Sequence, residues 1–586
     1  MGNKNIVGIS AQFHDSACCV LKNGKLVAAA QEERFSRLKH DSRIPRLAFR
    51  FCLEEAGLDI AQISCIAYYE NPQRKAARQI WTLLDNNPPF DLLLRIDPGR
   101  AEHEIRTCLG YEGEIRWFEH HQTHAASSFF YSGFAEAAIM TMDGVGEWKT
   151  GIYGYGCGRQ IACVDSVSFP HSLGLLYSTI TDYLGFSVND SEYKVMGLAP
   201  YGRPIYADRI RRMVDMPQPG QYRLNLKYFD FQRADRMYSD ELPELLGGSA
   251  RASGSPICQF HQDIASSLQT VLEEIVLAGA EYVHGLCGYD ALCLAGGVAL
   301  NCVANRRIHK DGPFKRMFVQ PAASDAGCAL GAAALAWYEE EGASPIAPMQ
   351  HDFLGPAFTS ADVLRILGAC GVPASDFRGR EKELLHTTAD LLAQGMVVGW
   401  MQGRMEFGPR SLGARSILAD PRRPEMRDRI NALIKQREGF RPFAPAVLAS
   451  KASTHFDVNY DLPFMLETCQ VTSSLQLPAV RHVDGSARVQ TVSDSTNPRF
   501  AALLEAFDRR TGCPILLNTS FNMSDEPIVC SPADALVCFF RSEIDALVLE
   551  DFLIERRNIG ETFPLLQRSF ETGPTNIVSD RVYAMF

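Results

Sequence analysis

The sequence predicts an α/β protein of at least two domains, the first of which is a duplicated α/β unit. Three observations lead to this prediction. The chain has 586 residues and is 46% hydrophobic, so it can bury a large core and is too long for one compact unit. Two separate stretches each begin with an apolar strand pattern, a polar turn and a second strand. A short Pro-containing stretch, Gly342–Met349, is typical of a linker between domains.

The first of the two stretches opens the chain. Ile6–Ser10 is a short apolar run typical of a strand. Ala17–Leu21 and Lys25–Ala30 follow it as a hairpin pattern joined at Asn23-Gly24, a dipeptide that favours tight hairpin turns. The sequence therefore predicts three consecutive strands.

The second stretch repeats this arrangement. Ala137–Met142 is an apolar strand pattern, a polar turn follows, and Thr150–Tyr155 begins the next strand. A long helical pattern over Gln259–His284 then leads into an apolar strand at Ala291–Ala295 and a Gly-Gly turn. A strand, glycine turn and helix in this order is the outline of a nucleotide site.

The domain boundary is expected shortly after Gly342–Met349, because a fresh helix pattern begins at Ser360 and runs to Cys370. We predict an N-terminal domain over residues 1–350 and a C-terminal domain over residues 370–586.

Charge and composition exclude some classes of protein. Lys plus Arg total 58 against 69 Asp plus Glu, giving a net charge of −11, whereas proteins that follow a nucleic-acid backbone usually have a basic domain. The 17 cysteines are scattered without a CxxC pair, which favours buried thiols in a reducing compartment. The start of the chain shows no signal peptide, and no apolar run reaches the roughly 18 residues of a membrane span. We expect a soluble cytoplasmic protein.

One segment, from Gly399 to Arg441, reverses the acidic balance with ten Lys and Arg residues against five carboxylates. Gly403, Gly408 and Gly413 lie among these arginines, so the backbone can approach a ligand while guanidinium groups bind phosphate oxygens in pairs. The segment predicts a site for a small anion. A solvated charged face is the alternative.

A metal site is predicted from two histidines four residues apart. On a helix His120 and His124 project from one face and can meet a single ion, while His121 points elsewhere. Asp143 directly follows an apolar strand and Asp325 lies in a turn of small residues, so both could supply further ligands. Two histidines with two carboxylates suit iron, manganese or zinc. Histidines at a helix surface or in the core are the alternative.

The chain has a set of distinctive motifs spread over nearly its full length: His14–Ser16, His120–His124, Asp143–Trp148, His171–Ser178, Glu192–Gly202, Leu294–Asn305, Lys435–Pro445, His482–Val492 and Leu517–Asn522. Taken together, these motifs resemble those of the ATP-dependent O-carbamoyltransferases of antibiotic and nodulation-factor biosynthesis.

This resemblance implies an N-terminal domain like those of the actin and hexokinase ATPases and a C-terminal YrdC-like α/β domain. The C-terminal domain would convert carbamoyl phosphate and ATP into a carbamoyl adenylate, releasing pyrophosphate. The residues implied in binding the phosphates are Arg410, Arg415, Lys435, Arg441 and Arg488. Ser520 and Asn522 resemble the YrdC-type Ser-x-Asn pair and could hydrogen-bond the carbamoyl group. A turn that caps a helix is the alternative for this pair.

The N-terminal domain would then transfer the carbamoyl group to a hydroxyl. His14, in the first strand-to-hairpin turn, is the candidate base, and a satisfied turn histidine is the alternative. The resemblance implies iron at His120, His124, Asp143 and Asp325. Gly296, Gly297 and Asn301 are expected to border the adenosine, or the glycines serve packing only.

The expected cofactors and co-substrates are ATP with magnesium, carbamoyl phosphate and a divalent metal ion. The expected partner is a small-molecule hydroxyl acceptor, with a homodimer as one option and with no nucleic acid and no membrane. Other classes are a tRNA-modifying threonylcarbamoyl transferase, a sugar-kinase-like ATPase and a nucleotide-binding scaffold without activity. The acidic balance and the form of the Asp143–Trp148 segment disfavour the tRNA-modifying enzyme, which would share the metal motif. A sugar-kinase-like ATPase should need neither the histidine pair nor the second domain, and a scaffold would not need the complete set of metal ligands and arginines.

Overall fold

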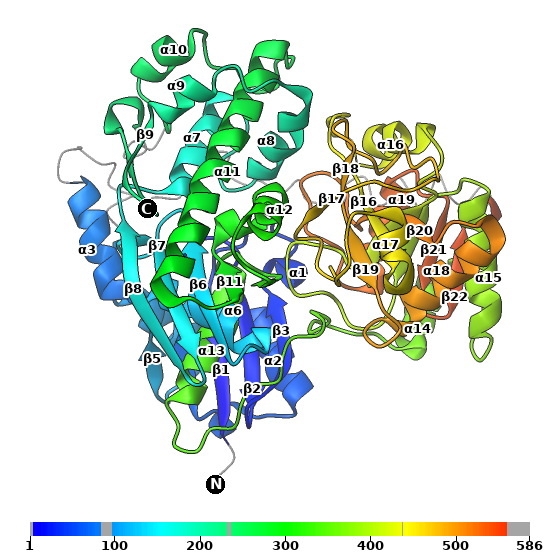
Figure 1. Ribbon diagram of the computed structural model, residues 1–586. Helices are drawn as coiled ribbons and strands as arrows, with labels where there is room; N and C mark the ends of the chain where they lie inside the picture. The colour runs from blue at the N-terminus through cyan, green and yellow to red at the C-terminus, as the bar shows by residue number, and fades with distance from the viewer. Residues whose placement is uncertain (1–3, 84–95, 231–235, 436, 560–586) are drawn as a thin grey trace. The chain divides into compact units, whose positions relative to one another are not determined.

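The computed structural model describes residues 4–83, 96–230, 236–435 and 437–559, and the chain divides into two compact units (Figure 1). The N-terminal unit contains the described residues up to Glu32 and from His40 to Met349. The C-terminal unit contains residues 33–39 together with the described residues from Gln350 to Ile559. The end of the predicted C-terminal domain, residues 560–586, lies outside the described residues.

The N-terminal unit holds two five-stranded sheets with the same topology. In each, three consecutive antiparallel strands are followed by two parallel strands on the side of the first strand. The first sheet has the order β3-β2-β1-β4-β5 and the second the order β8-β7-β6-β11-β12. The strands are β1 Asn5–Ser10, β2 Ala17–Lys22, β3 Lys25–Gln31, β4 Cys65–Tyr68, β5 Ile115–Trp117, β6 Glu136–Met142, β7 Lys149–Cys157, β8 Gln160–Ser168, β11 Ala291–Ala295 and β12 Arg316–Val319. The unit therefore has the predicted duplicated α/β fold.

The local turn chemistry accounts for the first hairpin. Asn23 and Gly24 connect β2 to β3, and both have positive φ angles, of 53° and 80°. Two-residue hairpins of this kind need positive φ at both central residues, which Asn and Gly tolerate best. The strand and hairpin predictions for this part of the chain are confirmed.

Two helices, α6 (His120–Ser132) and α13 (Asp325–Tyr338), pack between the two sheets. Helix α13 packs on β1, β2 and β4, helix α6 packs on β6, β7 and β11, and the helices also pack against each other. Small residues make this close packing feasible: a Cβ at Gly331 would lie 1.8 Å from the Thr123 carbonyl oxygen, and one at Gly8 would lie 1.9 Å from that of Ala329. The helix crossing brings the first turns of α6 and α13 together.

Gly331→Ala is expected to lower the free energy of unfolding of the N-terminal unit by about 2 kcal/mol or more, because the added methyl group meets backbone atoms that cannot rotate away. Gly285→Ala is the matched control, since a Cβ at this helical glycine meets nothing within 4 Å and alanine favours helix by roughly 0.5–1 kcal/mol. Urea midpoints followed by circular dichroism would show the difference. Equal midpoints for the two variants would contradict the close crossing.

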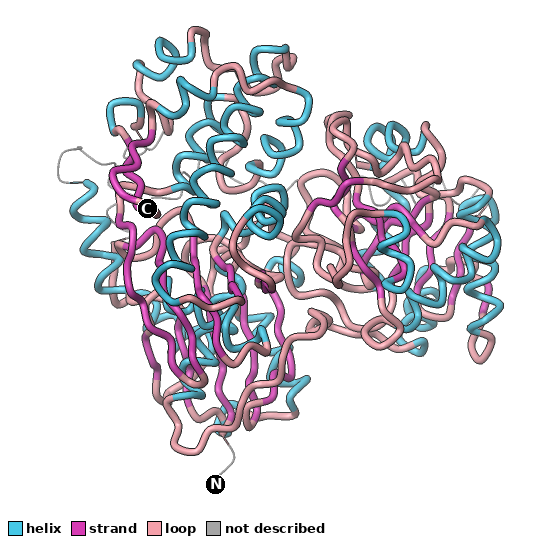
Figure 2. Tube along the Cα trace, in the orientation of Figure 1, coloured by secondary structure: helices cyan, strands magenta, loops and turns pink. Residues whose placement is uncertain are grey.

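The remaining elements of the N-terminal unit surround these sheets. Helix α11 (Gln259–Cys287) packs on β6 and β7, and α2 (Arg46–Ala56) packs on β2 and β3. The others are α3 Pro72–Leu83, α5 Arg100–Leu109, α7 Leu173–Tyr183, α8 Glu192–Leu198, α9 Ala207–Arg211, α10 Glu241–Leu246, α12 Cys302–Asp311 and the hairpin β9 Val214–Gln218 with β10 Gln221–Leu224. Figure 2 shows α7 to α11 as a helical region at one end of the sheets.

The C-terminal unit is built on an eight-stranded mixed sheet of order β13-β22-β21-β14-β15-β20-β16-β19. Helices α15 and α18 pack together, and α18 and α19 pack on strands of the sheet. The strands are β13 Ser375–Asp376, β14 Val398–Met401, β15 Arg415–Ala419, β16 Ala444–Leu448, β19 Gln490–Val492, β20 Ile515–Ser520, β21 Ala546–Leu549 and β22 Phe552–Glu555. A small sheet pairs β17 Thr468–Gln470 with β18 Ser486–Arg488, and the helices are α14 Ser360–Cys370, α15 Glu381–Ala393, α16 Glu425–Arg429, α17 Ala452–His455, α18 Pro498–Thr511 and α19 Pro532–Arg541.

The segment 33–39, which includes the short helix α1 (Glu33–Ser36), belongs to the C-terminal unit although the chain on both sides of it belongs to the other. Arg34 donates a hydrogen bond to the Gly408 carbonyl oxygen at 2.8 Å. Arg37 donates to the carbonyl oxygens of Pro527 and Ile528, both at 2.7 Å. The chain therefore joins the units at more places than the predicted linker alone.

Candidate functional site

The four predicted metal ligands lie together in the N-terminal unit. His120 begins α6, His124 is one turn later, Asp143 follows β6, and Asp325 begins α13. The Nε2 atoms of His120 and His124 are 3.1 Å apart, and Asp143 Oδ2 lies 3.0 Å and 3.3 Å from them. Asp325 Oδ1 lies 3.7 Å from His120 Nε2 and 3.8 Å from His124 Nε2. The helix crossing and the end of β6 thus gather two nitrogen and two oxygen donors.

The spacing and burial of these donors fit a divalent metal ion. Two donors bound about 2.1 Å from one ion are about 3.0–3.4 Å apart, close to most of the distances here. Both carboxylate oxygens of Asp325 are buried and have no hydrogen-bond partner in the described part of the chain. A buried carboxylate without a partner is costly unless a cation compensates it. The donor set suits iron, manganese or zinc.

The charges around the donors are strongly coupled. Burial opposes protonation of His120, but Asp325 and then Asp143 outweigh it and raise the pKa of His120 to about 9. Burial raises the pKa of Asp143, but hydrogen bonds from His120 and His124 outweigh it and hold the pKa well below the usual range. Burial raises the pKa of Asp325. Without an ion, protons therefore partly compensate the buried carboxylates.

Metal binding is expected to strengthen as the pH rises from 6 to about 9, because His120 must lose its proton before Nε2 can coordinate an ion. Below pH 9 each bound ion should release about one proton. Calorimetry of Zn²⁺ binding in buffers of different ionisation enthalpy measures that proton. A binding constant that does not change over this pH range would contradict the protonated state of His120.

Several neighbours orient the donors. The Glu147 carboxylate accepts hydrogen bonds from the backbone N–H of His120, at 3.0 Å and 3.2 Å, and so caps α6. The backbone N–H of Gly297 donates to Asp143 Oδ1 at 3.0 Å. His121 is turned away from the donors toward Thr141 Oγ1, at 2.7 Å. Sequence reasoning missed Glu147, whose place inside an Asp-Gly-Val-Gly-Glu-Trp segment was the available signal.

The glycine turn after β11 has structural tasks. A Cβ at Gly296 would lie 2.2 Å from the Met142 carbonyl oxygen, and Gly296 has a φ of 92°, so this position requires glycine. Asn301 caps α12 by accepting from Ala304 N–H, and its amide pairs reciprocally with Gln269 at 3.0 Å and 3.1 Å. These contacts favour the packing alternative for Gly296 and a capping role for Asn301. Their position beside the adenosine stays a prediction.

His14 lies in the loop between β1 and β2, next to charges of the metal centre. Its Nδ1 is 3.1 Å from Asp15 Oδ2. Burial lowers its pKa, but Asp15 and then Asp325 outweigh this and raise it to about 9. An imidazole with this pKa is protonated at neutral pH and can accept a proton only after losing one. A cation beside Asp325 would lower that pKa and favour the predicted base role.

In the C-terminal unit, Lys435, Ser520 and Asn522 come together. Lys435 directly follows a π-helical turn, Ile430–Ile434, and is buried. Its Nζ donates to Asn522 Oδ1 at 2.6 Å, to the Asn522 carbonyl oxygen at 2.8 Å, to Ser520 Oγ at 3.1 Å and to the Ser520 carbonyl oxygen. Ser520 Oγ also donates to Asn522 Oδ1 at 2.7 Å. We call these three residues the lysine cradle.

Positive charge surrounds the lysine cradle. Burial, then Arg437 and, less strongly, Arg441 lower the pKa of Lys435 well below its usual range. The four oxygens around Nζ act in the opposite direction. Three are carbonyl oxygens that can only accept hydrogen bonds, and the fourth, the Ser520 hydroxyl, accepts from Nζ while donating to Asn522 Oδ1. Asn431 connects the two arginines: Arg437 Nε donates to its Oδ1 at 2.8 Å, and its amide donates to the Arg441 carbonyl oxygen at 3.1 Å. A buried amine beside two guanidinium groups is suited to an anionic ligand.

The other predicted arginines differ in their surroundings. Arg415 is fully buried, and its guanidinium donates to the carbonyl oxygens of Cys530, Gln402, Gly403, Ala414 and Pro356 at 3.0–3.2 Å. This arrangement fits a structural role better than phosphate binding. Arg410 and Arg488 are half-buried, and Arg488 lies at the end of β18.

The backbone N–H groups of the glycine-rich loop before Arg415 also bind another residue of the protein. Glu406 Oε1 accepts hydrogen bonds from the backbone N–H groups of Leu412 and Ala414, both at 2.7 Å, and of Arg415, at 3.1 Å. The amides that could have bound a phosphate therefore bind a buried carboxylate. This part of the anion-site prediction is replaced by an internal contact.

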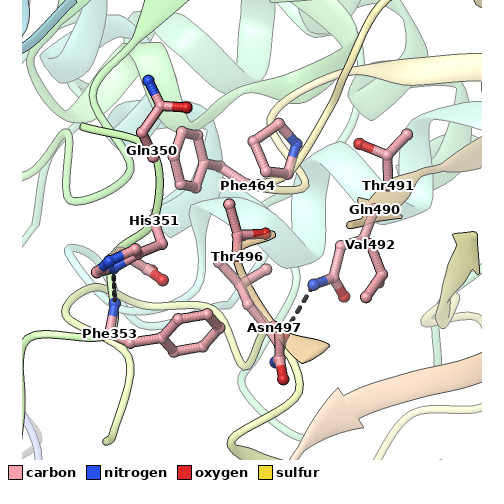
Figure 3. A pocket seen from close by; sticks show the side chains of 12 residues that line it. Gln350, His351, Phe353, Phe464, Gln490, Thr491, Val492, Thr496 and Asn497 are labelled. Carbon is pink, nitrogen blue, oxygen red and sulfur yellow. Dashed lines mark hydrogen bonds between the residues drawn. The ribbon is translucent and has the colours of Figure 1, made fainter. Parts of the chain in front are cut away.

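A small pocket in the C-terminal unit contains none of the predicted site residues (Figure 3). Phe353 and Phe464 supply aromatic surface, and Gln490 and Asn497 supply amides. Asp352 also lines it. Burial and, less strongly, the neighbouring Glu406 raise the pKa of Asp352 well above the usual range. Gln490, Thr491 and Val492 of its lining belong to the His482–Val492 segment that supports the resemblance, but the sequence did not indicate a pocket there.

Two family models match the chain. A model described as carbamoyltransferase N-terminus matches residues 5–89 and 104–334. A second, described as carbamoyltransferase C-terminus, matches residues 389–556. The matches cover most of both units.

Two relatives are similar to this chain over most of their length, and a third over less than half of its own. An uncharacterized protein of Synechocystis, sll1178, is 43% identical over 94% of this chain and 97% of its own. The nodulation protein NolNO of Sinorhizobium fredii is 40% identical over 93% of this chain and 79% of its own. A 3'-hydroxymethylcephem-O-carbamoyltransferase of Amycolatopsis lactamdurans is 37% identical over 44% of this chain and 47% of its own.

Among solved structures, HypF of T. kodakarensis aligns with a TM-score of 0.31 at 15% identity, over 58% of this chain and 48% of that one. The ROK hexokinase of Thermus thermophilus aligns with a TM-score of 0.29 at 14% identity, over 57% and 98%. These scores are too low to bear on function. The two family models and the full-length relatives identify the chain: it belongs to the carbamoyltransferase family.

Proposed function

We propose that this carbamoyltransferase uses carbamoyl phosphate and ATP to make a carbamoyl adenylate and transfers the carbamoyl group to a hydroxyl of a small molecule. The observation that carries the proposal is the presence of two distinct sites in one chain. One is the four-donor metal centre of the N-terminal unit, and the other is the lysine cradle of the C-terminal unit. The named O-carbamoyltransferase and nodulation relatives support a hydroxyl acceptor.

Adenylate formation is proposed for the C-terminal unit, as in a YrdC-like domain. Water would first hydrolyse carbamoyl phosphate to carbamate and phosphate, and a carbamate oxygen would then attack the α-phosphorus of magnesium-bound ATP. The bond between the α-phosphorus and the bridging oxygen would break, and pyrophosphate would leave. Lys435 and Arg441, with Arg410 and Arg488 as further candidates, would stabilise the phosphate charge. Ser520 and Asn522 would hydrogen-bond the planar carbamoyl group.

Carbamoyl transfer is proposed for the N-terminal unit. The acceptor oxygen would bond to the carbamoyl carbon, the bond to the adenylate oxygen would break, and AMP would leave. His14, once neutral, would take the hydroxyl proton. A divalent ion held by His120, His124, Asp143 and Asp325, proposed to be iron, would polarise an oxygen of the adenylate. Gly297 and Glu147 would keep these ligands oriented.

The proposed partner is a small acceptor in the cytoplasm, with a homodimer as one option, and neither a nucleic acid nor a membrane. The net charge of −11 supports this choice against tRNA. In the described ranges, every helix is too short or too polar to cross a bilayer.

The test is pyrophosphate release from ATP without an acceptor, measured with and without carbamoyl phosphate. Release that depends on carbamoyl phosphate and falls at least tenfold in Arg410→Ala is expected. Arg365→Ala is the control, since Arg365 lies on the exposed side of α14 with only Asp362 as an ion-pair partner in the structure. Phosphate release indifferent to carbamoyl phosphate would instead favour a sugar-kinase-like ATPase. Binding of tRNA would favour a threonylcarbamoyl transferase.

A further inference from the structure

A chain of hydrogen bonds runs from His14 through three further residues of the N-terminal unit. His14 Nδ1 lies 3.1 Å from Asp15 Oδ2, and the other oxygen of Asp15 lies 2.8 Å from His40 Nδ1. His40 Nε2 lies 2.9 Å from Asp190 Oδ1. The side chains of all four are between 13% and 29% exposed, so solvent reaches them without dominating their contacts. We call them the histidine relay.

The proton positions in the histidine relay follow from its acceptors. Each ring nitrogen of His40 faces a carboxylate, and an ionised carboxylate can only accept. Both nitrogens must therefore donate, which makes His40 an imidazolium. Asp15 then accepts from His40 on one oxygen and from His14 Nδ1 on the other. This arrangement leaves His14 Nε2 as the nitrogen that can exchange a proton.

The backbone around the histidine relay is held in an uncommon conformation. Gln12, Asp15, His40 and Asn189 have φ angles between 54° and 67°, a region that residues other than glycine seldom adopt. Such conformations persist where surrounding contacts enforce them, and they cluster at functional sites. Each segment of the relay contains a residue with a positive φ angle or lies next to one.

Backbone contacts hold these segments in place. The N–H of Gln12 donates to the Ser42 carbonyl oxygen at 2.7 Å, and the N–H of Ser16 donates to the Asp41 carbonyl oxygen at 3.0 Å. Around Asp190, the half-buried Glu192 side chain accepts from Asn189 N–H at 2.8 Å and from Ser178 Oγ at 2.7 Å. Glu192, the first residue of the Glu192–Gly202 motif, therefore helps to fix the loop that carries Asp190.

We propose that Asp15, His40 and Asp190 are positioning residues that hold His14 with Nδ1 bonded and Nε2 directed to the acceptor hydroxyl in the transfer step. This inference rests on the proposed function, which identifies the acceptor hydroxyl as the group that gives its proton to His14. The charged groups near His14 are Asp15 and His40 of the relay and Asp325 of α13, with Lys75 of α3 over the adjacent Phe13 ring. Asp15 favours protonation of His14, whereas the His40 cation opposes it.

Asp15 and Asp190 therefore change the pKa of His14 in opposite directions. Asp15→Asn removes the anion beside His14 and should make Nε2 more nucleophilic at pH 7. Asp190→Asn withdraws one of the two carboxylates that keep His40 charged. The negative charge of Asp15 then acts on His14 with less compensation, so Nε2 should become less nucleophilic. A residue that only stabilises the loop would increase the reactivity of His14 in both variants by loosening its surroundings.

The experiment measures the rate of carbethoxylation of His14 by diethyl pyrocarbonate at pH 7, read by peptide mass spectrometry on the full-length protein. The reagent attacks neutral imidazole, and each unit of pKa change alters the rate about tenfold. We expect faster modification in Asp15→Asn and slower modification in Asp190→Asn and His40→Gln, each by about three- to tenfold. Asp190→Glu should restore the wild-type rate. Asp208→Asn, at a side chain 95% exposed on α9, is the control.

Changes in the same direction for Asp15→Asn and Asp190→Asn, or no change in either, would overturn the relay. If Asp15→Asn does not fold, His40→Gln and Asp190→Asn still decide, since both must slow the modification. The rate is independent of catalysis, so wild-type protein that releases no pyrophosphate would overturn the proposed function while leaving the relay measurable.

Discussion

Asp325→Asn is expected to remove tight metal binding while stabilising the metal-free protein. Neither of the buried Asp325 oxygens accepts a hydrogen bond from the described residues, and its nearest charged neighbours are the other predicted ligands His120 and His124, at 3.7 Å and 3.8 Å. The amide keeps the size of the side chain but contributes no charge to an ion. We expect the affinity for Zn²⁺ or Fe²⁺ to fall at least a hundredfold, a loss comparable with or larger than that caused by removing groups that orient metal ligands.

The stabilisation is the more specific half of this prediction. In the metal-free protein the Asp325 carboxyl group occupies a buried position, and burial raises its pKa. A neutral amide avoids the cost of burying a charge there, which is worth about 1–3 kcal/mol. The metal-free variant should therefore unfold at a higher urea concentration than metal-free wild type. With metal in excess, the variant should unfold at a lower urea concentration than wild type.

Metal content after dialysis, measured by mass spectrometry, and urea midpoints with and without chelator check both halves. Asp311→Asn is the matched control, since Asp311 lies at the end of α12 and pairs only with Arg307 in the structure. Loss of stability in metal-free Asp325→Asn would show that the carboxylate has a structural task and would contradict a site arranged for a cation.

Local patterns in the sequence were sufficient to predict the elements that carry this metal centre. The apolar run of β6 and the spacing of His120 and His124 depend only on neighbours within a few residues, so strand and helix periodicity could indicate them. The position of Asp325 depended on the α6–α13 crossing, which small residues such as Gly331 permit. The structure places Asp325 beside the other three predicted donors, and its role as a ligand stays a prediction.

Contacts distant in sequence could not be predicted in the same way. Arg415 lies in a basic, glycine-rich segment, and nothing local distinguishes a guanidinium that binds phosphate from one enclosed by carbonyl oxygens. Its five acceptors come from four separate parts of the C-terminal unit. The same holds for residues 33–39, whose assignment to the C-terminal unit depends on contacts of Arg34 and Arg37 hundreds of residues away. Periodicity carries no information about such partners.

Lys435→Met is expected to lower carbamoyl-phosphate-dependent pyrophosphate release by about a hundredfold to a thousandfold, the range typical of removing a preorganised group that stabilises developing charge. Methionine approximates the volume of the lysine stem, so the buried position stays filled. What is lost is the amine that holds Ser520 and Asn522 in place through four oxygens. The effect should appear in kcat as well as in KM, because the charge on phosphate changes during the reaction.

Lys435→Arg should fail as well, although it keeps the positive charge. The oxygens of Ser520 and Asn522 surround a single nitrogen, and a planar guanidinium cannot present its donors to them in that geometry. Crowding with Arg437 and Arg441 would add to the loss, since both already lower the pKa of Lys435. A variant with retained charge and lost activity would separate the geometry of the lysine cradle from its charge.

Lys451→Met is the matched control, because this lysine is half-exposed and pairs with Asp508 at the surface of the same unit. Rates should be compared at saturating ATP and carbamoyl phosphate on variants whose circular dichroism matches wild type. Retention of more than half of the activity in Lys435→Met would remove the lysine cradle from adenylate formation. Because the cradle is the most concentrated set of predicted anion-binding residues that the fold brings together, the anion site would then have to be sought around Arg410 or Arg488 instead.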